Sequence, residues 1–155
     1  MEKLITAAEV VDIAFGGAVN LRPSEVGDAT IIAAQRKFIL PVFGSAMTEA
    51  LANGEHAAWS ERFLKKPLAL YVKFLLLPAL AAQVGMAGVV KYSGEGFAAA
   101  DAVTFRLLLR RIKSDADALL DSAVESVESA PASFPLYDAR QNVRHRVSLE
   151  GNIVF

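Results

Sequence analysis

Residues 101–129, DAVTFRLLLRRIKSDADALLDSAVESVES, are the longest stretch of the chain with a single periodicity. Apolar residues recur three or four positions apart over several turns, which is the pattern of a helix with one buried face. The members of this face are Phe105, Leu108, Leu109, Ile112, Ala116, Leu119, Leu120, Ala123, Val124 and Val127. Pro131 opposes continuation because proline lacks the backbone N–H donor. We predict one long helix, from Ala98 or Asp101 to Ser129, as the backbone of the fold.

The charged residues of this helix follow an unusual order. The N-terminal half is basic and the C-terminal half is acidic, whereas the helix dipole favours the reverse order by a few tenths of a kcal/mol per charge. The basic residues are Arg106, Arg110, Arg111 and Lys113, and the acidic residues are Asp115, Asp117, Asp121, Glu125 and Glu128. Something outside the helix could therefore favour this order.

Two interpretations of the charge order remain open. The first is a solvated face on which side chains four positions apart pair where the two blocks meet, as for Arg111 with Asp115 and Lys113 with Asp117. The second is packing of identical subunits, in which Arg110 and Arg111 of one subunit meet Asp117 and Asp121 of the next. Such a heterologous contact can close into a ring.

The helices before this stretch are shorter. Thr6 and Glu9 form a capping-box pattern, and Gly16 follows the first apolar face as a stop signal. A second helical pattern runs from Glu25 to Ile39. We predict that Pro41 ends that helix, because proline disfavours the helical conformation of the residue before it.

Residues 37–51, KFILPVFGSAMTEAL, therefore read as a corner between two helices. Gly44 supplies a flexible residue and Ser45 a hydroxyl that can cap the next helix. That helix is expected to reach the stop signal Asn53-Gly54. Val42 and Phe43 are expected to point into the core.

A short helix containing Trp59 is expected to end at Lys65-Lys66, before the most apolar part of the chain. Residues 67–84, PLALYVKFLLLPALAAQV, read as a helix with a kink at Pro78. We favour a buried helix of a bundle. An uncharged run from Phe74 to Val90 approaches the length that spans ~30 Å of hydrocarbon, so a membrane-spanning helix is the alternative.

Two segments favour strands. Residues 85–96, GMAGVVKYSGEG, read as a loop that carries a short strand. In residues 144–155, RHRVSLEGNIVF, alternation places Val147 and Leu149 on one face, and Glu150-Gly151-Asn152 can turn the chain into a hairpin. Because so short a hairpin is marginal alone, it either docks on its own helices or acts as an interaction arm that adds a strand to another chain.

Composition limits the classes of function. The 155 residues suit one domain, and 54% of them are hydrophobic. The chain has no Cys, and 16 Lys and Arg nearly balance 17 Asp and Glu, so no net field recruits nucleic acid. His56 and His145 stand in no metal-ligand spacing, and no catalytic motif occurs. We therefore identify no catalytic, cofactor-binding or metal-ligating residue and expect no enzyme.

The arrangement of these segments resembles that of a known family. The segments are LITAAEVVDIAF (4–15), KFILPVFGSAMTEAL (37–51), PLALYVKFLLLPAL (67–80), the glycine-bearing loop (85–96) and SLEGNIVF (148–155). Together they resemble small helical head–tail connector or head-completion proteins of tailed phages and prophages. The resemblance implies an α-helical adaptor without enzymatic activity, which forms a ring beneath the portal and lets DNA pass through its lumen.

The sequence therefore predicts a single, mainly helical domain over residues 1–155, with a small β element and an interaction arm at 144–155. Its expected function is that of a structural adaptor, whose partners are further copies of itself and the portal and tail proteins, in a virion assembled in the host cytoplasm. The interface residues predicted are Arg110, Arg111, Asp117, Asp121, Val147 and Leu149. The alternatives are a small membrane-spanning or membrane-active protein and a cytosolic helical binding module.

Overall fold

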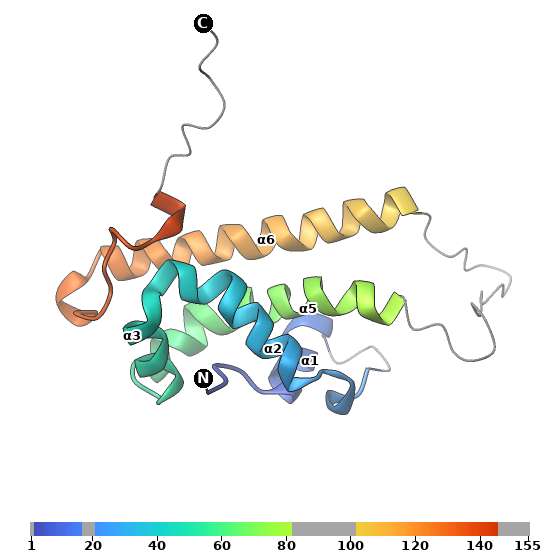
Figure 1. Cartoon of the computed structure of the whole chain (residues 1–155), viewed down its shortest axis with the longest axis horizontal. Helices are drawn as coiled ribbons and strands as arrows, with labels where there is room; N and C mark the ends of the chain where they lie inside the picture. The colour runs from blue at the N-terminus through green and yellow to red at the C-terminus, as the bar shows by residue number, and fades with distance from the viewer. Residues whose placement is uncertain (1, 17–20, 82–101, 146–155) are drawn as a thin grey trace, which may run out of the picture.

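The computed structural model describes residues 2–16, 21–81 and 102–145, and these residues are mainly helical (Figure 1). The α-helices are α1 (Ala7–Phe15), α2 (Asp28–Ala34), α3 (Leu40–Ala52), α4 (Ala57–Trp59), α5 (Lys65–Ala81) and α6 (Ala102–Glu128). Two π-helical turns, η2 (Gln35–Ile39) and η3 (Ser60–Leu64), and three 3₁₀ turns, η1 (Pro23–Glu25), η4 (Pro131–Ser133) and η5 (Val143–His145), connect them. The predicted long C-terminal helix is confirmed.

No strand occurs in these three ranges. The segments in which the sequence favours strands, around Val89–Tyr92 and over 147–155, lie outside them. The structure therefore does not support the predicted hairpin. Within the predicted arm, Arg144 and His145 belong to the 3₁₀ turn η5 and contact α6.

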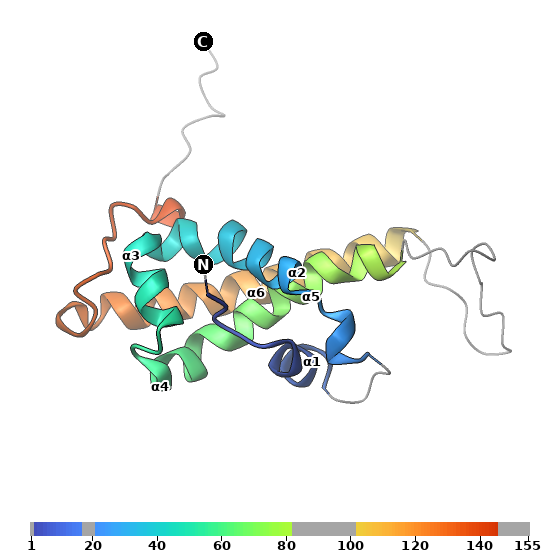
Figure 2. The same ribbon diagram turned by 60° about the horizontal axis from the view of Figure 1, so that its bottom comes forward.

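Helix α6 runs along the length of the described fold, and α5 lies beside it in the opposite direction (Figures 1 and 2). Helices α1 and α2 also pack against α5, on sides that α6 does not cover (Figure 2). This central position explains why α5 is so apolar: Leu68, Ala69, Val72 and Leu76 are all buried. Among the described residues, no helix combines the length and the apolar character that crossing a membrane requires.

Lys73 lies within this apolar helix, and its charge is accommodated by α1. Its Nζ donates a hydrogen bond of 2.7 Å to the carbonyl oxygen of Ala14 and lies 4.8 Å from the centre of the Phe15 ring. Both partners belong to the last turn of α1, where the helix dipole favours a cation. The lysine therefore connects α5 to the end of α1.

The helix ends predicted at Thr6, Gly16 and Asn53-Gly54 are confirmed. Thr6 and Glu9 form the capping box of α1, with each side chain bonding the backbone of the other. Gly16 ends α1 in the left-handed conformation, and Gly54 has a φ of 90° directly after α3. These signals depend on residues a few positions apart, so they act locally.

The expectation that Pro41 ends a helix is wrong, as is the expected helix end before Pro67. The chain remains helical through both prolines, and a π-helical turn precedes each of them. In these turns the N–H of Leu40 donates to the carbonyl of Gln35, and that of Lys65 to Ser60, five positions back. In a regular α-helix a proline ring clashes with the carbonyl four positions back. The wider π-helical turn changes the alignment of the carbonyls before the proline, so the helix can continue.

The break in this part of the chain occurs at Gly44 instead. Its φ of 76° and ψ of 169° are non-helical, and they lie in a region that is essentially restricted to glycine. The hydroxyl of Thr48 donates a 2.7 Å hydrogen bond to the Gly44 carbonyl and satisfies that acceptor. The corner predicted between Pro41 and Ser45 therefore exists as a kink at one glycine.

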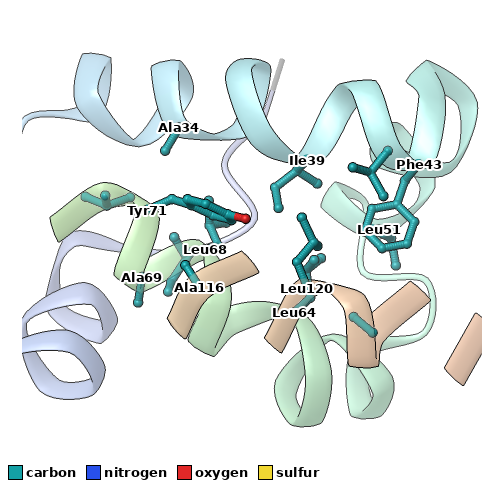
Figure 3. Close-up of a cluster of buried hydrophobic side chains, with 14 of the residues drawn as sticks. Ala34, Ile39, Phe43, Leu51, Leu64, Leu68, Ala69, Tyr71, Ala116 and Leu120 are labelled. Carbon is teal, nitrogen blue, oxygen red and sulfur yellow. The ribbon is translucent and has the colours of Figure 1, made fainter. Parts of the chain in front are cut away.

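The hydrophobic core lies between α5, α6 and the η2–α3 segment (Figure 3). In the close-up, Tyr71 lies between Ala34 and Ala116, and Ile39 points toward Leu120 and Leu64. The Tyr71 ring stacks on Phe38 with a centroid separation of 4.0 Å. As predicted, Val42 and Phe43 are buried.

After α6 the chain returns along the bundle through residues 131–145. Phe134 is buried near the end of α6, with its ring centroid 5.3 Å from Trp59 and 4.5 Å from His56. The Trp59 indole N–H donates a 2.9 Å hydrogen bond to Ser126 Oγ on α6. The return segment is thus part of the folded domain.

Candidate functional site

The N-terminal third of α6 presents apolar and basic side chains to solvent. Val103, Leu107 and Leu108 are 56%, 58% and 46% exposed and lie within two turns of one another, so they form a patch and are not scattered single residues. Arg110 and Arg111, which the sequence predicts to be interface residues, are exposed beside them. We call this surface the basic end; its residues are Val103, Arg106, Leu107, Leu108, Arg110 and Arg111.

The predicted apolar stripe of this helix divides into two parts. From Ile112 to Val127 its members are buried, except for the partly exposed Leu119, because α5 and the η3 turn pack against that part of α6. Of its N-terminal members, Leu108 is exposed and Phe105 and Leu109 are partly exposed. Beside them, Val103, Arg106, Leu107 and Arg110 line a shallow hollow of roughly 230 Å³. Apolar surface next to arginines is typical of protein–protein contacts, where arginine is enriched.

The acidic half of α6 is partly occupied by the chain itself. Asp117 Oδ1 accepts a 2.6 Å hydrogen bond from the hydroxyl of Tyr71 on α5, and Oδ2 accepts one of 2.7 Å from Lys113. Arg144 Nη1 lies 3.3 Å from Asp117 Oδ1, and its Nε donates a 2.5 Å bond to Asp121 Oδ1. Both acidic residues predicted for a subunit interface therefore hold Arg144 of their own chain.

These contacts change the ionisation of their members. Burial alone would raise the pKa of Asp117, but hydrogen bonds from Lys113, Tyr71 and Arg144 outweigh it and lower the pKa of this carboxyl. Burial, together with the bond to Asp117, raises the pKa of Tyr71. The hydrogen bond to Asp121 is the largest cause that raises the pKa of Arg144. The cluster thus favours the charged form of Asp117 and keeps Tyr71 protonated.

A second cluster fixes the return segment at the end of α6. Glu128 Oε1 accepts a 2.6 Å hydrogen bond from the Tyr137 hydroxyl and lies 2.7 Å from His145 Nε2. Burial, with the bond to Glu128, raises the pKa of Tyr137 to about 12. The fully buried Asn142 donates to the Tyr137 hydroxyl and accepts from the backbone N–H of Arg144. The segment that carries Arg144 is therefore held by contacts independent of Asp117 and Asp121.

The sequence identified three of the five members of the first cluster, Lys113, Asp117 and Asp121. Asp117 and Asp121 stand out in the charge order of α6, and Lys113 precedes Asp117 by one turn. Arg144 and Tyr71 were missed because they are 23 or more residues from their α6 partners, and no spacing rule covers such a distance. Val147 and Leu149, the other predicted interface residues, lie outside the described residues.

The features that stand out among the described residues are the ion pairs of α6 and the exposed apolar surface of the basic end. No group of three or more His, Asp or Glu side chains in this part of the chain is placed to hold a metal ion. His56 packs on Phe134, whereas His145 lies beside Glu128. We therefore take the surface of α6 as the candidate site.

Asp117→Asn is expected to lower the free energy of unfolding at pH 7 by about 1–3 kcal/mol, because the charged acceptor of three donors is lost. Since the folded pKa of Asp117 is depressed, its contribution is fully present above the unfolded value of about 3.9 and is lost as pH falls through the folded value. The difference between variant and wild type should thus shrink below about pH 4. Urea unfolding at several pH values measures it.

The matched control is Asp115→Asn, because Asp115 is exposed and faces Arg111 at 4.0 Å. This change is expected to stay within about 0.5 kcal/mol of wild type. Equal losses for the two variants would contradict the role given to Asp117.

Comparison with known proteins identifies one family. A model described as a family of unknown function, DUF6712, matches residues 42–147, which is more than half of the chain and includes α5 and α6. No curated protein and no solved structure matches the chain.

Proposed function

Since the chain belongs to DUF6712, a family whose function is unknown, we propose its function from the surface of α6 and from the resemblance of its motifs. The protein is a structural adaptor of a tailed phage or prophage particle and assembles as a ring at the head–tail junction. Its partners are further copies of itself, the portal and the tail proteins, and DNA passes through the ring only as cargo. It acts in the virion after assembly in the host cytoplasm.

The observation that carries this proposal is the basic end of α6. Burial of Leu107 and Leu108 against a neighbouring copy contributes hydrophobic free energy to association. Arg110 and Arg111 orient the neighbour by pairing with its acidic residues. The outer surface of the same helix is acidic farther along, at the exposed Asp121 and beyond. Each copy therefore carries both halves of a complementary contact.

This complementarity constrains the geometry of the ring. Arg110 and Asp121 are eleven positions apart, hence about 16 Å along the helix axis. If neighbouring α6 helices stood upright at the same height, basic ends would face basic ends. The ring therefore requires α6 to incline strongly away from the ring axis, so that the basic end of one copy reaches the acidic half of the next. Val147 and Leu149, which lie outside the described residues, remain part of the proposed interface.

Reversing Arg110 and Arg111 to Glu is expected to weaken each subunit contact by up to about 30-fold, since two exposed pairs contribute about 0.2–1 kcal/mol each. The measurement is the particle mass in solution, alone and with the portal protein, at ~0.1 M and ~1 M salt. The wild-type contact should weaken at high salt, where the screening length falls to about 3 Å.

Arg140→Glu serves as the control, because Arg140 is 91% exposed on the return segment and pairs with the nearby Asp138. It is expected to assemble like wild type. If the double reversal also assembles like wild type at low salt, the charges of α6 form a solvated face and the proposed contact is wrong.

A further inference from the structure

We infer that Arg144 is an intramolecular competitor for the acidic site of α6, and that its release regulates assembly of the protein. This inference rests on the proposed function, because the site it blocks is the one that a neighbour's arginine would occupy. In the folded chain, the Arg144 guanidinium group bonds Asp121 through Nε and Asp117 through Nη1 and Nη2, the last at 3.3 Å from the Asp117 carbonyl oxygen.

Arg144 and the arginines of a neighbouring copy compete for the acidic site because both present the same chemical group to it. Arg144 reaches α6 from the return segment, whereas Arg110 and Arg111 project from the basic end of α6. Both sources offer a guanidinium group, whose planar donors match a carboxylate. While Arg144 occupies the acidic pair, an arginine of another copy meets a site that is already neutralised.

The ion pair between Arg144 and Asp121 can be replaced by a pair with an arginine of another copy. Its side chain is 27% exposed and that of Asp121 is 53% exposed, so water can replace the bond as it opens. When Arg144 leaves, Asp117 keeps its bonds to Tyr71 and Lys113. The buried part of the cluster thus stays satisfied, and release does not require unfolding of α5 or α6.

Release changes Asp121 more than Asp117. Among the described contacts, Asp121 pairs with Arg144 alone, so the departure of Arg144 frees a half-exposed carboxylate. The rest of the return segment remains held by Phe134 in the core and by Tyr137 on Glu128. Only the side chain of Arg144 needs to move, because its backbone N–H stays bonded to Asn142 and His145 stays beside Glu128. Arg144 therefore acts as a latch that covers the acceptor side of the proposed subunit contact.

The test compares Arg144→Gln with Arg140→Gln in the full-length chain. Arg140 lies on the same segment and pairs with Asp138, its one partner among the described residues, so its variant controls for the loss of one positive charge. We expect Arg144→Gln to self-associate at least threefold more tightly than wild type or Arg140→Gln, as measured by sedimentation over a range of protein concentrations. Circular dichroism checks that each variant is folded. Arg144→Lys, which keeps the charge but not the planar fork, should give a smaller gain and replaces the Gln variant if that one does not fold.

A third variant shows which surface produces the gain. Adding Arg110→Glu and Arg111→Glu to Arg144→Gln should return self-association to the wild-type level or below, because the donor side of the contact is removed. If the gain persists in this variant, it comes from another surface and the latch is overturned.

The outcomes also separate the latch from the proposed function. If all chains that retain Arg110 and Arg111 associate equally, and the double reversal abolishes association, the subunit contact stands and the latch is overturned. If the double reversal changes association in no background, both are overturned. If folded Arg144→Gln remains monomeric at every concentration, the latch is overturned, and assembly with the portal protein still tests the proposed function.

Discussion

Leu120→Ala is expected to lower the free energy of unfolding by about 2–5 kcal/mol. Leu120 is fully buried on α6, and Figure 3 shows it with Leu64 and Ile39, where three elements meet. Truncation removes apolar contacts and leaves a cavity that a packed helical core can close only in part. Reversible urea unfolding with an unchanged m-value measures the loss.

Leu107→Ala on the same helix is the matched control. Leu107 is exposed, so the identical truncation is expected to change the free energy of unfolding by less than about 0.5 kcal/mol. It should nevertheless weaken subunit association if the basic end is an interface. Similar stability losses for the two variants would mean that Leu107 is covered and that the basic end is not a free surface.

Gly44→Ala is expected to destabilise the protein by about 1–3 kcal/mol, because a residue with a Cβ atom is strained at φ 76° and ψ 169°. At roughly 2–4 °C per kcal/mol for a chain of this size, thermal unfolding should shift by several degrees. An added Cβ atom would also lie 3.2 Å from Gln141 Oε1 of the return segment.

A second substitution separates the two causes. Gln141→Ala removes the side-chain contact but not the backbone strain, so the double variant should remain nearly as destabilised as Gly44→Ala. Full recovery in the double variant would show that the steric contact dominates. Gly54→Ala offers a further comparison, because Gly54 has a φ of 90° but no atom within 4 Å of an added Cβ.

The sequence by itself determined the features that depend on neighbouring residues. The capping box at Thr6 and the stop at Gly16 are present as predicted, and so is the apolar stripe from Ile112 to Val127 apart from Leu119. Each results from side chains and backbone groups within one or a few helical turns. Such local rules do not require knowledge of the rest of the fold.

Tertiary packing decided where the helices bend. The rule that proline ends a helix assumes regular α-helical geometry, and the π-helical turns before Pro41 and Pro67 depart from it. In the first of these turns, the fully buried Gln35 accepts a hydrogen bond from the Leu4 N–H and donates one to the Glu2 carbonyl. These partners are more than thirty positions away, so no pattern around Pro41 could indicate them.

Tertiary structure also decided the partners of the charged residues on α6. The sequence identified Arg110, Arg111, Asp117 and Asp121 as charges in need of partners, and it left open whether those partners belong to the same chain. Asp121 binds Arg144, which is 23 positions away. An ion pair has the same chemistry within a chain and between chains, and only the distances set by the fold determine which carboxylate an arginine reaches first.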